Sequence, residues 1–148
     1  RALGNRSILA NPTLSNMKDR INKVIKKREG FRPFAPMVTK EKQDQFFEMT
    51  DDVPYMNQVV KVKEEYRDKL PAGTHVDGSA RVQTVYKYTV IHDLLREFEK
   101  LSGYPILLNT SFNVKDKTMV LTPKDAIYTF FDTDMDILVM GNYVMYKN

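Results

Sequence analysis

The sequence predicts a single α/β or α+β domain in which helices pack on a mixed sheet. Segments with apolar residues at helical spacing alternate with short apolar runs of strand length. The chain also closes on two such runs separated by a Gly-Asn pair, which is typical of a β-hairpin. Its 148 residues, 42% of them hydrophobic, suit one globular domain with a sizeable core, so we treat 1–148 as one domain.

The first half of the chain is predicted to combine helices with extended segments. An Asn-Pro pair is typical of a helix start, and the apolar spacing after it predicts a helix over 13–27 that Gly30 ends. Two prolines then favour an extended path over 31–38. A short helix over 41–49 and a strand over 55–62 follow.

The second half carries strong turn and capping signals. The elements predicted there are a charged connection over 64–71, extended pieces over 74–76 and 80–85, a helix over 91–101, a buried strand over 105–109, a helix from 122 to 131, and hairpin strands over 136–140 and 143–146. Asp77-Gly78 separates the two extended pieces, and Gly103 stands where a helix C-cap is expected. A buried strand is predicted over 105–109 because its sequence is apolar on both faces.

Composition narrows the function classes. Cysteine is absent, so neither a disulfide nor a thiolate metal site is available, which suits a reducing cytoplasm. No apolar run approaches the roughly 20 residues that cross a bilayer, so we expect a cytoplasmic domain without membrane contact. Residues 18–32 hold seven basic side chains against two acidic ones, which indicates an anionic partner, although a solvated helix face is the alternative.

Three segments carry groups suited to binding phosphate. The first, KKREGFRP, brings Lys26, Lys27, Arg28 and Arg32 to the end of the first helix. We expect Asn22, Lys26 and Arg28 on the side opposite the apolar stripe. A helix C-terminus repels anions, so side chains and the following loop must build any site here. Alternatively, these cations only compensate the negative helix end.

The second segment, HVDGSARVQ, alternates polar and apolar residues. The polar members are His75, Asp77, Ser79, Arg81 and Gln83. Where the segment is extended, alternation sends them to one face, which is either a ligand-binding face or a solvent-facing one. His75 is a candidate general acid or base, but two histidines without supporting acids do not make a metal site, so none is expected in this chain.

The third segment, LLNTSFNVK, follows the predicted buried strand. Its donors and acceptors are Asn109, Thr110, Ser111, Asn113 and Lys115. Ligands collect beyond the carboxyl ends of strands in α/β sheets, although a hydrogen-bonded turn is the alternative. Neither a nucleophile elbow nor a phosphate-loop motif occurs. The residues alone therefore predict a basic pocket for a phosphorylated small molecule, a nucleotide or a nucleic acid.

The chain resembles the C-terminal domain of the O-carbamoyltransferases in four segments of matching order and spacing: RALGNRSILANP, MKDRINKVIKKREGFRPFAP, THVDGSARVQTV and GYPILLNTSFNVK. That family includes nodulation carbamoyltransferases and those that modify cephamycin and tobramycin-type antibiotics. The resemblance implies a YrdC-like domain, with a mixed twisted sheet flanked by helices, that binds carbamoyl phosphate and ATP with Mg²⁺. It would form carbamoyl adenylate and release phosphate and pyrophosphate.

The resemblance also implies a larger N-terminal domain that is missing here, with residues 1–12 at the junction. That domain, which resembles the tRNA threonylcarbamoyl transferases and holds a metal ion, would transfer the carbamoyl group to an acceptor hydroxyl. This chain would keep the adenylation half. Small-molecule phosphates, a nucleotide and the N-terminal domain are the expected partners. An RNA-binding or tRNA-modification role is the alternative, although basic and aromatic residues are not interleaved as stacking platforms require. A plain interaction domain is a third possibility.

YrdC-like proteins carry a K-x-R and S-x-N signature that Lys26 to Arg28 and Ser111 to Asn113 match in form. The catalytic residues that the resemblance implies are Lys26, Arg28, Arg32 and Ser111. The ligand-binding residues that it implies are Arg1, Arg6, Lys27, His75, Arg81, Asn109 and Asn113. The resemblance equally allows the working lysine to be Lys27 and the working arginine to be Arg32, and at Asp116 it leads us to expect glycine. Catalysis would rest on positioning and charge neutralisation.

Overall fold

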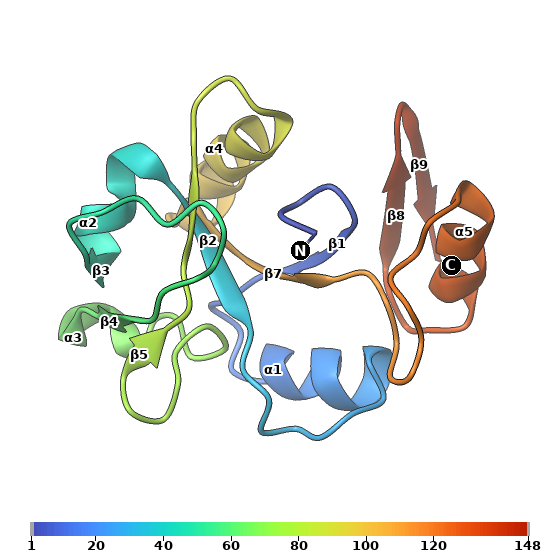
Figure 1. The fold of residues 1–148 in the computed structure, drawn as a ribbon, viewed down its shortest axis with the longest axis horizontal. Coiled ribbons are helices and arrows are strands. Elements are labelled where there is room, and N and C mark those ends of the chain that lie inside the picture. Colours follow the sequence, from blue (N-terminus) through green and yellow to red (C-terminus); the bar gives the residue numbers. More distant parts are fainter. Residues whose placement is uncertain (1, 148) are drawn as a thin grey trace.

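A four-stranded mixed sheet lies at the centre of the computed structural model, which describes residues 2–147 (Figure 1). Its strands, in spatial order, are β1 (Ser7–Ala10), β7 (Ile106–Ser111), β2 (Ala35–Thr39) and β6 (Gln83–Val85). β7 pairs antiparallel with both β1 and β2, whereas β2 and β6 are parallel. The predicted α+β class with a mixed sheet is therefore confirmed.

Two smaller sheets and several helices complete the fold. The strands are β3 (Phe47–Glu48), β4 (Val60–Val62) and β5 (Ser79–Ala80) in one sheet, and β8 (Ile137–Met140) and β9 (Tyr143–Tyr146) in a hairpin. The helices are α1 (Met17–Asp19), a π-helix (Arg20–Ile25), a 3₁₀-helix (Lys40–Lys42), α2 (Gln43–Phe46), α3 (Glu64–Arg67), α4 (Val90–Ser102) and α5 (Pro123–Phe131). No helix within residues 2–147 is long and apolar enough to cross a bilayer.

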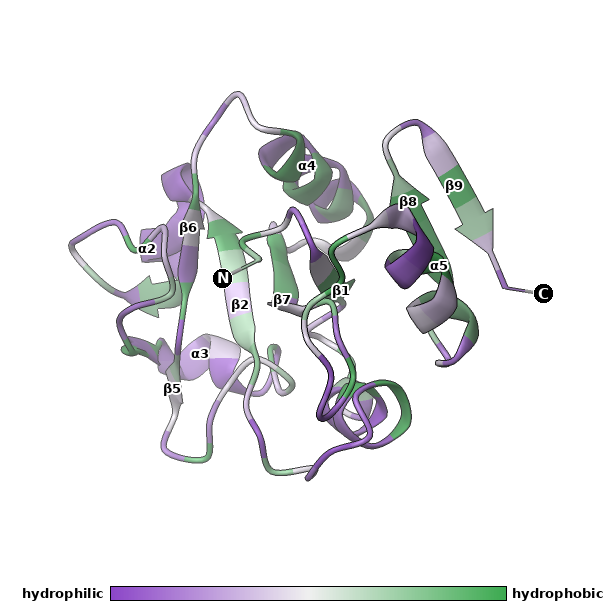
Figure 2. Cartoon of the chain, turned by 45° about the vertical axis from the view of Figure 1, so that its right-hand side comes forward, coloured by the Kyte–Doolittle hydropathy of each residue, from purple (hydrophilic) through white to green (hydrophobic). Residues whose placement is uncertain are grey.

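Helices cover both faces of the central sheet. Leu107 packs in a cluster with Leu95 of α4, whereas Leu108 packs in another cluster with Ile21 of the π-helix. Figure 1 shows α4 and α1 on opposite sides of β7, and Figure 2 shows apolar residues along β2 and β7 between the helices. Burial on both sides explains why β7 has no polar face until Asn109.

Elements with strong local signals match their predictions. α4 ends at Gly103, which adopts a left-handed φ of 81° as a C-cap. α5 begins with a capping box between Thr122 and Asp125, and the hairpin turns at Gly141-Asn142. In each case the residues that fix the element lie inside it or beside it.

The predicted helix over 13–27 is wrong at both ends. Asn11 is not its cap, because Asn11 Oδ1 instead accepts hydrogen bonds from the backbone and hydroxyl of Thr13. The helix begins at Met17, widens into the π-helix, and ends at Ile25 before Gly30 is reached.

Other boundaries also differ. Phe47–Glu48 leave the predicted helix over 41–49 to form β3, and only Val60–Val62 of the predicted strand over 55–62 pair in a sheet. Residues 74–76 are not a strand, because the backbone turns from His75 to Gly78. Two elements were not predicted from the sequence. α3 lies in the predicted connection over 64–71, and β1 lies in 1–12 and pairs with β7.

Candidate phosphate-binding site

Two adjoining cavities lie where β7 ends, with volumes of about 260 and 180 Å³. The larger is lined by Ala2, Leu3, Arg28, Pro33, Phe34, Ala35, Met56, Arg81, Asn109, Thr110 and Ser111. The smaller is lined by Lys26, Arg28, Arg32, Ser111, Asn113, Val114, Lys115 and Asp116. Arg28 and Ser111 belong to both walls. The structure thus brings together the predicted groups of the first and third segments, with Arg81 from the second.

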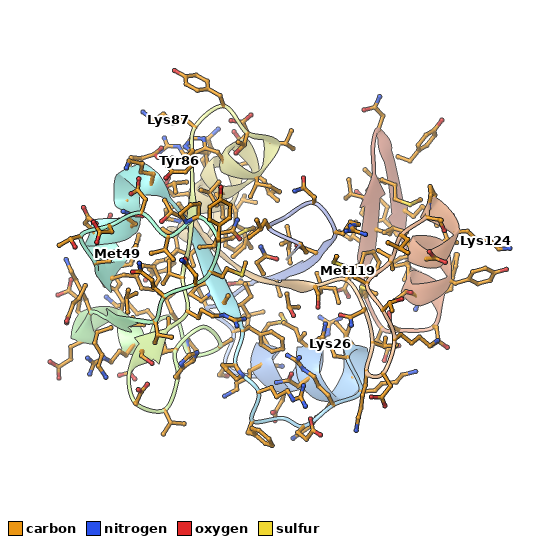
Figure 3. The ribbon with its side chains drawn as sticks, viewed as in Figure 1. Lys26, Met49, Tyr86, Lys87, Met119 and Lys124 are labelled. Carbon is orange, nitrogen blue, oxygen red and sulfur yellow. The ribbon has the colours of Figure 1, made fainter. Side chains whose placement is uncertain are left out.

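Lys26 joins the end of the π-helix to the loop after β7 (Figure 3). Its Nζ lies 2.7 Å from the carbonyl oxygen of Ser111, 3.0 Å from Asn113 Oδ1 and 3.4 Å from Ser111 Oγ. Only 3% of Lys26 is exposed. Burial and the nearby charge of Arg28 lower the pKa of Lys26 to about 8. Because three oxygens surround the ammonium, Lys26 holds the K-x-R and S-x-N segments together.

The left-handed backbone of Lys27 sets the register of this segment. Its φ of 53° closes the helix end, where the Arg28 N–H donates to the Asn22 carbonyl at 2.8 Å in a widened Schellman-type bond. Lys27 is consequently turned away from the cavities, and its Nζ lies 3.6 Å from Asp132 Oδ2. Lys26 and Arg28 therefore line the cavity walls, and Lys27 does not.

Arg28 is held by a residue whose position was predicted wrongly. Asn22 is fully buried, where a position on the solvent side was expected. Its Oδ1 accepts from Arg28 Nε at 2.7 Å, and its Nδ2 donates to the Gly30 and Arg32 carbonyls at 3.1 and 2.8 Å. A π turn and the loop that folds back over it give this amide three partners. A polar residue six positions before the arginine is only a weak sequence signal.

The Arg28 guanidinium is held in place, stays charged and has donors free to bind an anion. It lies over the Phe34 ring, 5.0 Å from the centroid, and is half-buried. Burial and the charge of Arg32 lower its pKa, yet a guanidinium keeps its proton throughout the physiological range. No hydrogen bond joins its two terminal nitrogens to any other residue of 2–147. Both nitrogens are therefore available to a ligand oxygen in either cavity.

Ser111 and Asn113 form the loop side of the smaller cavity. The Ser111 hydroxyl donates to Asn113 Oδ1 at 2.6 Å, and Asn113 Nδ2 donates to the Lys117 carbonyl at 2.8 Å. The Asn113 oxygen thus accepts from both Ser111 and Lys26, and one of its two N–H groups is used within the loop. Ser111 keeps acceptor capacity toward the cavities, because its single proton already has a partner.

The rim of the smaller cavity is positive with one exception. Arg32 pairs with Glu29 at 3.0 Å, and Lys115 lies 3.9 Å from the same carboxylate. Asp116 is the one acid among the residues that line this cavity, and its φ is 60°. Glycine suits that conformation best, which gives a physical reason for expecting it there.

The second segment is divided between different environments. Arg81 is exposed in the wall of the larger cavity, whereas Ser79 and Gln83 are buried. The expected single polar face does not form, because the turn at Asp77-Gly78 interrupts the extended backbone. Gln83 instead accepts from Asn109 Nδ2 at 2.7 Å through its Oε1.

Several predicted ligand-binding residues lie outside both cavities. Arg6 Nη1 donates to the Val120 carbonyl at 2.9 Å. His75 Nδ1 lies 3.1 Å from Ser79 Oγ, and burial lowers the pKa of its ring, which favours the neutral form. Arg1 lies outside the described residues. The structure therefore groups Lys26, Arg28, Arg32, Arg81, Asn109, Ser111 and Asn113 around the cavities, without Arg6, Lys27 or His75.

Replacing Lys27 by glycine is expected to stabilise the fold by roughly 0.5–1 kcal/mol, because glycine adopts a positive φ without steric cost. The exposed contact with Asp132 offsets little of this gain. Urea unfolding measures the change. Lys23→Gly, at an exposed position within the π-helix, is the matched control and should destabilise by about 1 kcal/mol. A destabilised Lys27→Gly protein would contradict the role assigned to this left-handed residue.

Comparison with known proteins is consistent with the resemblance seen in the sequence. The sequence profile of the family described as Carbamoyltransferase C-terminus matches residues 1–147. Nodulation protein NolNO of Sinorhizobium fredii is 51% identical over 152 residues, covering 99% of this chain and 22% of that protein. Nodulation protein NolO of Bradyrhizobium diazoefficiens is 50% identical and likewise covers 99% of this chain and 28% of its own length.

A shorter match supports the same assignment. Nodulation protein U of Azorhizobium caulinodans is 47% identical over 115 residues, covering 76% of this chain and 20% of that protein. The matched segments thus span 20% to 28% of the length of these three relatives. With a family profile that runs from residue 1 to residue 147, the chain belongs to the carbamoyltransferase C-terminal family.

Proposed function

We propose that this chain binds carbamoyl phosphate and ATP and forms carbamoyl adenylate, as the C-terminal part of a cytoplasmic O-carbamoyltransferase. The observation that carries the proposal is the pair of adjoining cavities that share Arg28 and Ser111. Two ligands that react with each other need adjacent sites. Two phosphorylated ligands also need concentrated positive charge, which Lys26, Arg28 and Arg81 supply in the walls.

The proposed reaction has two steps, the release of phosphate and the formation of the adenylate. Water releases inorganic phosphate from carbamoyl phosphate and leaves carbamate. A carbamate oxygen then forms a bond to the α-phosphorus of ATP, and the bond from that phosphorus to the bridging oxygen breaks, so that pyrophosphate leaves. The residues contribute by placing the ligands and neutralising their charge, and no covalent bond to the protein is formed.

Arg28 has the central role in this proposal. Arg28 lines both cavities, its terminal nitrogens would bind the two ligands, and Asn22 holds its guanidinium through Nε. Lys26 holds the Ser111 loop and adds a second charge. Mg²⁺ would neutralise phosphate charge on ATP and needs few protein ligands when phosphates supply the others, so the single carboxylate of Asp116 suits it.

The acceptor step belongs to sequence that this chain does not cover. The relatives named above are nodulation proteins several times its length. We propose that the carbamoyl group passes from the adenylate to a hydroxyl bound in that remaining part, which would also hold the metal ion implied by the resemblance. This chain would then contact that part of the same polypeptide.

Calorimetry and product analysis on the full-length protein test the proposal. We expect ATP to bind, and we expect carbamoyl phosphate with Mg²⁺ to drive pyrophosphate release in equal amounts with carbamoyl adenylate. Omitting carbamoyl phosphate is the control and should stop pyrophosphate release. Salt-sensitive RNA binding without any response to carbamoyl phosphate would contradict the proposal and favour the nucleic-acid alternative.

A further inference from the structure

One face of the β8–β9 hairpin is apolar and exposed. Directly opposed residues of two paired strands share a face, and the register sets Ile137 against Tyr146 and Val139 against Val144. Between 50% and 69% of each of these four residues is exposed. The opposite face carries Leu138, which is buried in a cluster with residues of α5 and β1. The hairpin is thus packed on one side only, and we call Ile137, Val139, Val144 and Tyr146 its outer face.

The hairpin also lacks the features that protect a free β-edge. Charged residues, proline or a covering element normally prevent an exposed edge from pairing with other chains. Neither a charged residue nor a proline occurs between Asp136 and Lys147. Within the part of the chain that the structure describes, β8 and β9 pair only with each other. Figure 2 shows hydrophobic residues along both strands at the edge of the molecule. A continuous apolar face without charge is typical of a surface that another element covers.

The start of the chain lies beside the hairpin. Arg6 Nη1 donates to the Val120 carbonyl at 2.9 Å, and Val120 belongs to the same apolar cluster as Ile8 of β1 and Leu138 of β8. Figure 1 shows β1 and the segment before it next to β8. The relatives named above are several times longer than this chain, and the matching family profile describes a C-terminus. A large part that precedes residue 1 would therefore join this domain close to the outer face.

A second copy of this chain fits the outer face less well. A stable interface between separate proteins takes roughly 20–30 residues from each side, and the outer face offers only four. A part of the same polypeptide needs fewer contacts, because the connecting backbone keeps its local concentration high. The size of the face therefore favours an occupant that is covalently joined to the domain.

We propose that the outer face of the hairpin packs against an apolar surface on the part of the polypeptide that precedes residue 1. This inference rests on the contact with that part in the proposed function, and it assigns the surface that makes the contact. The complement is apolar because a charged group buried against these four side chains would have no partner. None of the four lines either cavity, so this docking surface is separate from the candidate phosphate-binding site.

Photo-crosslinking of the full-length protein tests the docking. A benzophenone amino acid replaces Val144 on the outer face or, as the matched control, Val76, a fully exposed valine in the turn before β5. Figure 1 shows β5 and the hairpin at opposite ends of the molecule. From position 144 we expect crosslinks within one polypeptide to a segment outside residues 1–148, and from position 76 several times less of such product.

A charge substitution gives a second measurement. Val144→Lys places an ammonium on the outer face, so the docking should loosen. Amide hydrogen exchange in the segment that crosslinks to position 144 should then become about tenfold faster or more. Val76→Lys is the matched control and should leave that exchange unchanged. Both variants should retain pyrophosphate release, because neither residue lines a cavity, and this activity also shows that they fold.

The outcomes separate this inference from the proposed reaction. Crosslinks between two polypeptides assign the outer face to a second copy and overturn the proposal. Equal yields from positions 144 and 76, or unchanged exchange in a folded Val144→Lys protein, overturn it as well. If Val144→Lys does not fold, the crosslinks decide. Any of these failures with normal pyrophosphate release overturns the docking alone. The expected crosslinks in a wild type that releases no pyrophosphate support the docking and overturn the reaction.

Discussion

Replacing Arg28 by alanine in the full-length protein is expected to lower carbamoyl-phosphate-dependent pyrophosphate release by about 100-fold or more. Arg28 is the one basic residue that lines both cavities, and its terminal nitrogens have no partner among residues 2–147. Each hydrogen bond to a charged group contributes roughly 1.5–3 kcal/mol, so losing two such bonds costs at least about 3 kcal/mol. Initial rates at saturating ATP measure the effect.

Two further variants show whether the guanidinium itself is needed. Arg28→Lys keeps the charge but loses the planar fork and the bond to Asn22, so it should recover only a small part of the rate. Arg20→Ala is the matched control, because Arg20 lies in the π-helix that precedes Arg28, pairs with Asp136 at 2.7 Å and lines neither cavity. It should retain near-normal turnover. Near-normal turnover in Arg28→Ala would mean that Arg28 does not bind the two ligands in these cavities.

The parts of the fold that the sequence predicts well are those specified by neighbouring residues. Gly103 ends α4 and Thr122 caps α5, because each acts within one helical turn. The helix after residue 13 was predicted less well, since its end depends on a π turn and on the left-handed backbone of Lys27. β1 depends on pairing with β7, about 100 residues later, so local patterns did not indicate it.

The residues of the candidate site also differ in how well the sequence predicts them. The charged and hydroxyl residues of the signature, such as Lys26, Arg28 and Ser111, stand out by residue type and spacing. The buried amides beside them do not stand out, because Asn22, which bonds Arg28, and Gln83, which bonds Asn109, look like ordinary surface residues in sequence. Their partners are set by the tertiary fold, which only the structure supplies.

Replacing Lys26 by methionine is expected to weaken the binding of phosphate ligands by roughly 10- to 100-fold, because the loop after β7 loses the ammonium that holds it and the cavity loses a positive charge.

Proton uptake on ligand binding is a second effect that we expect from Lys26. Its pKa of about 8 leaves part of the wild type deprotonated near pH 8.5, and a bound anion favours the charged form. Wild-type binding at that pH should therefore take up a proton, and Lys26→Met should not. Calorimetry in buffers of different ionisation enthalpy measures this uptake.

Stability gives an independent test that needs no ligand. Because the pKa of Lys26 is about 8 in the folded chain and 10.5 for an ordinary lysine, the unfolded chain binds more protons between these pH values. Folding therefore becomes more favourable as pH rises through this window. Relative to Lys26→Met, the wild type should gain about 3 kcal/mol between pH 8 and pH 10.5. Lys23→Met removes an exposed lysine of the π-helix and keeps Lys26, so its stability should change with pH as that of the wild type does. Equal pH dependence in the wild type and Lys26→Met would mean that this ammonium is not desolvated, and Lys26 would then be an ordinary surface charge.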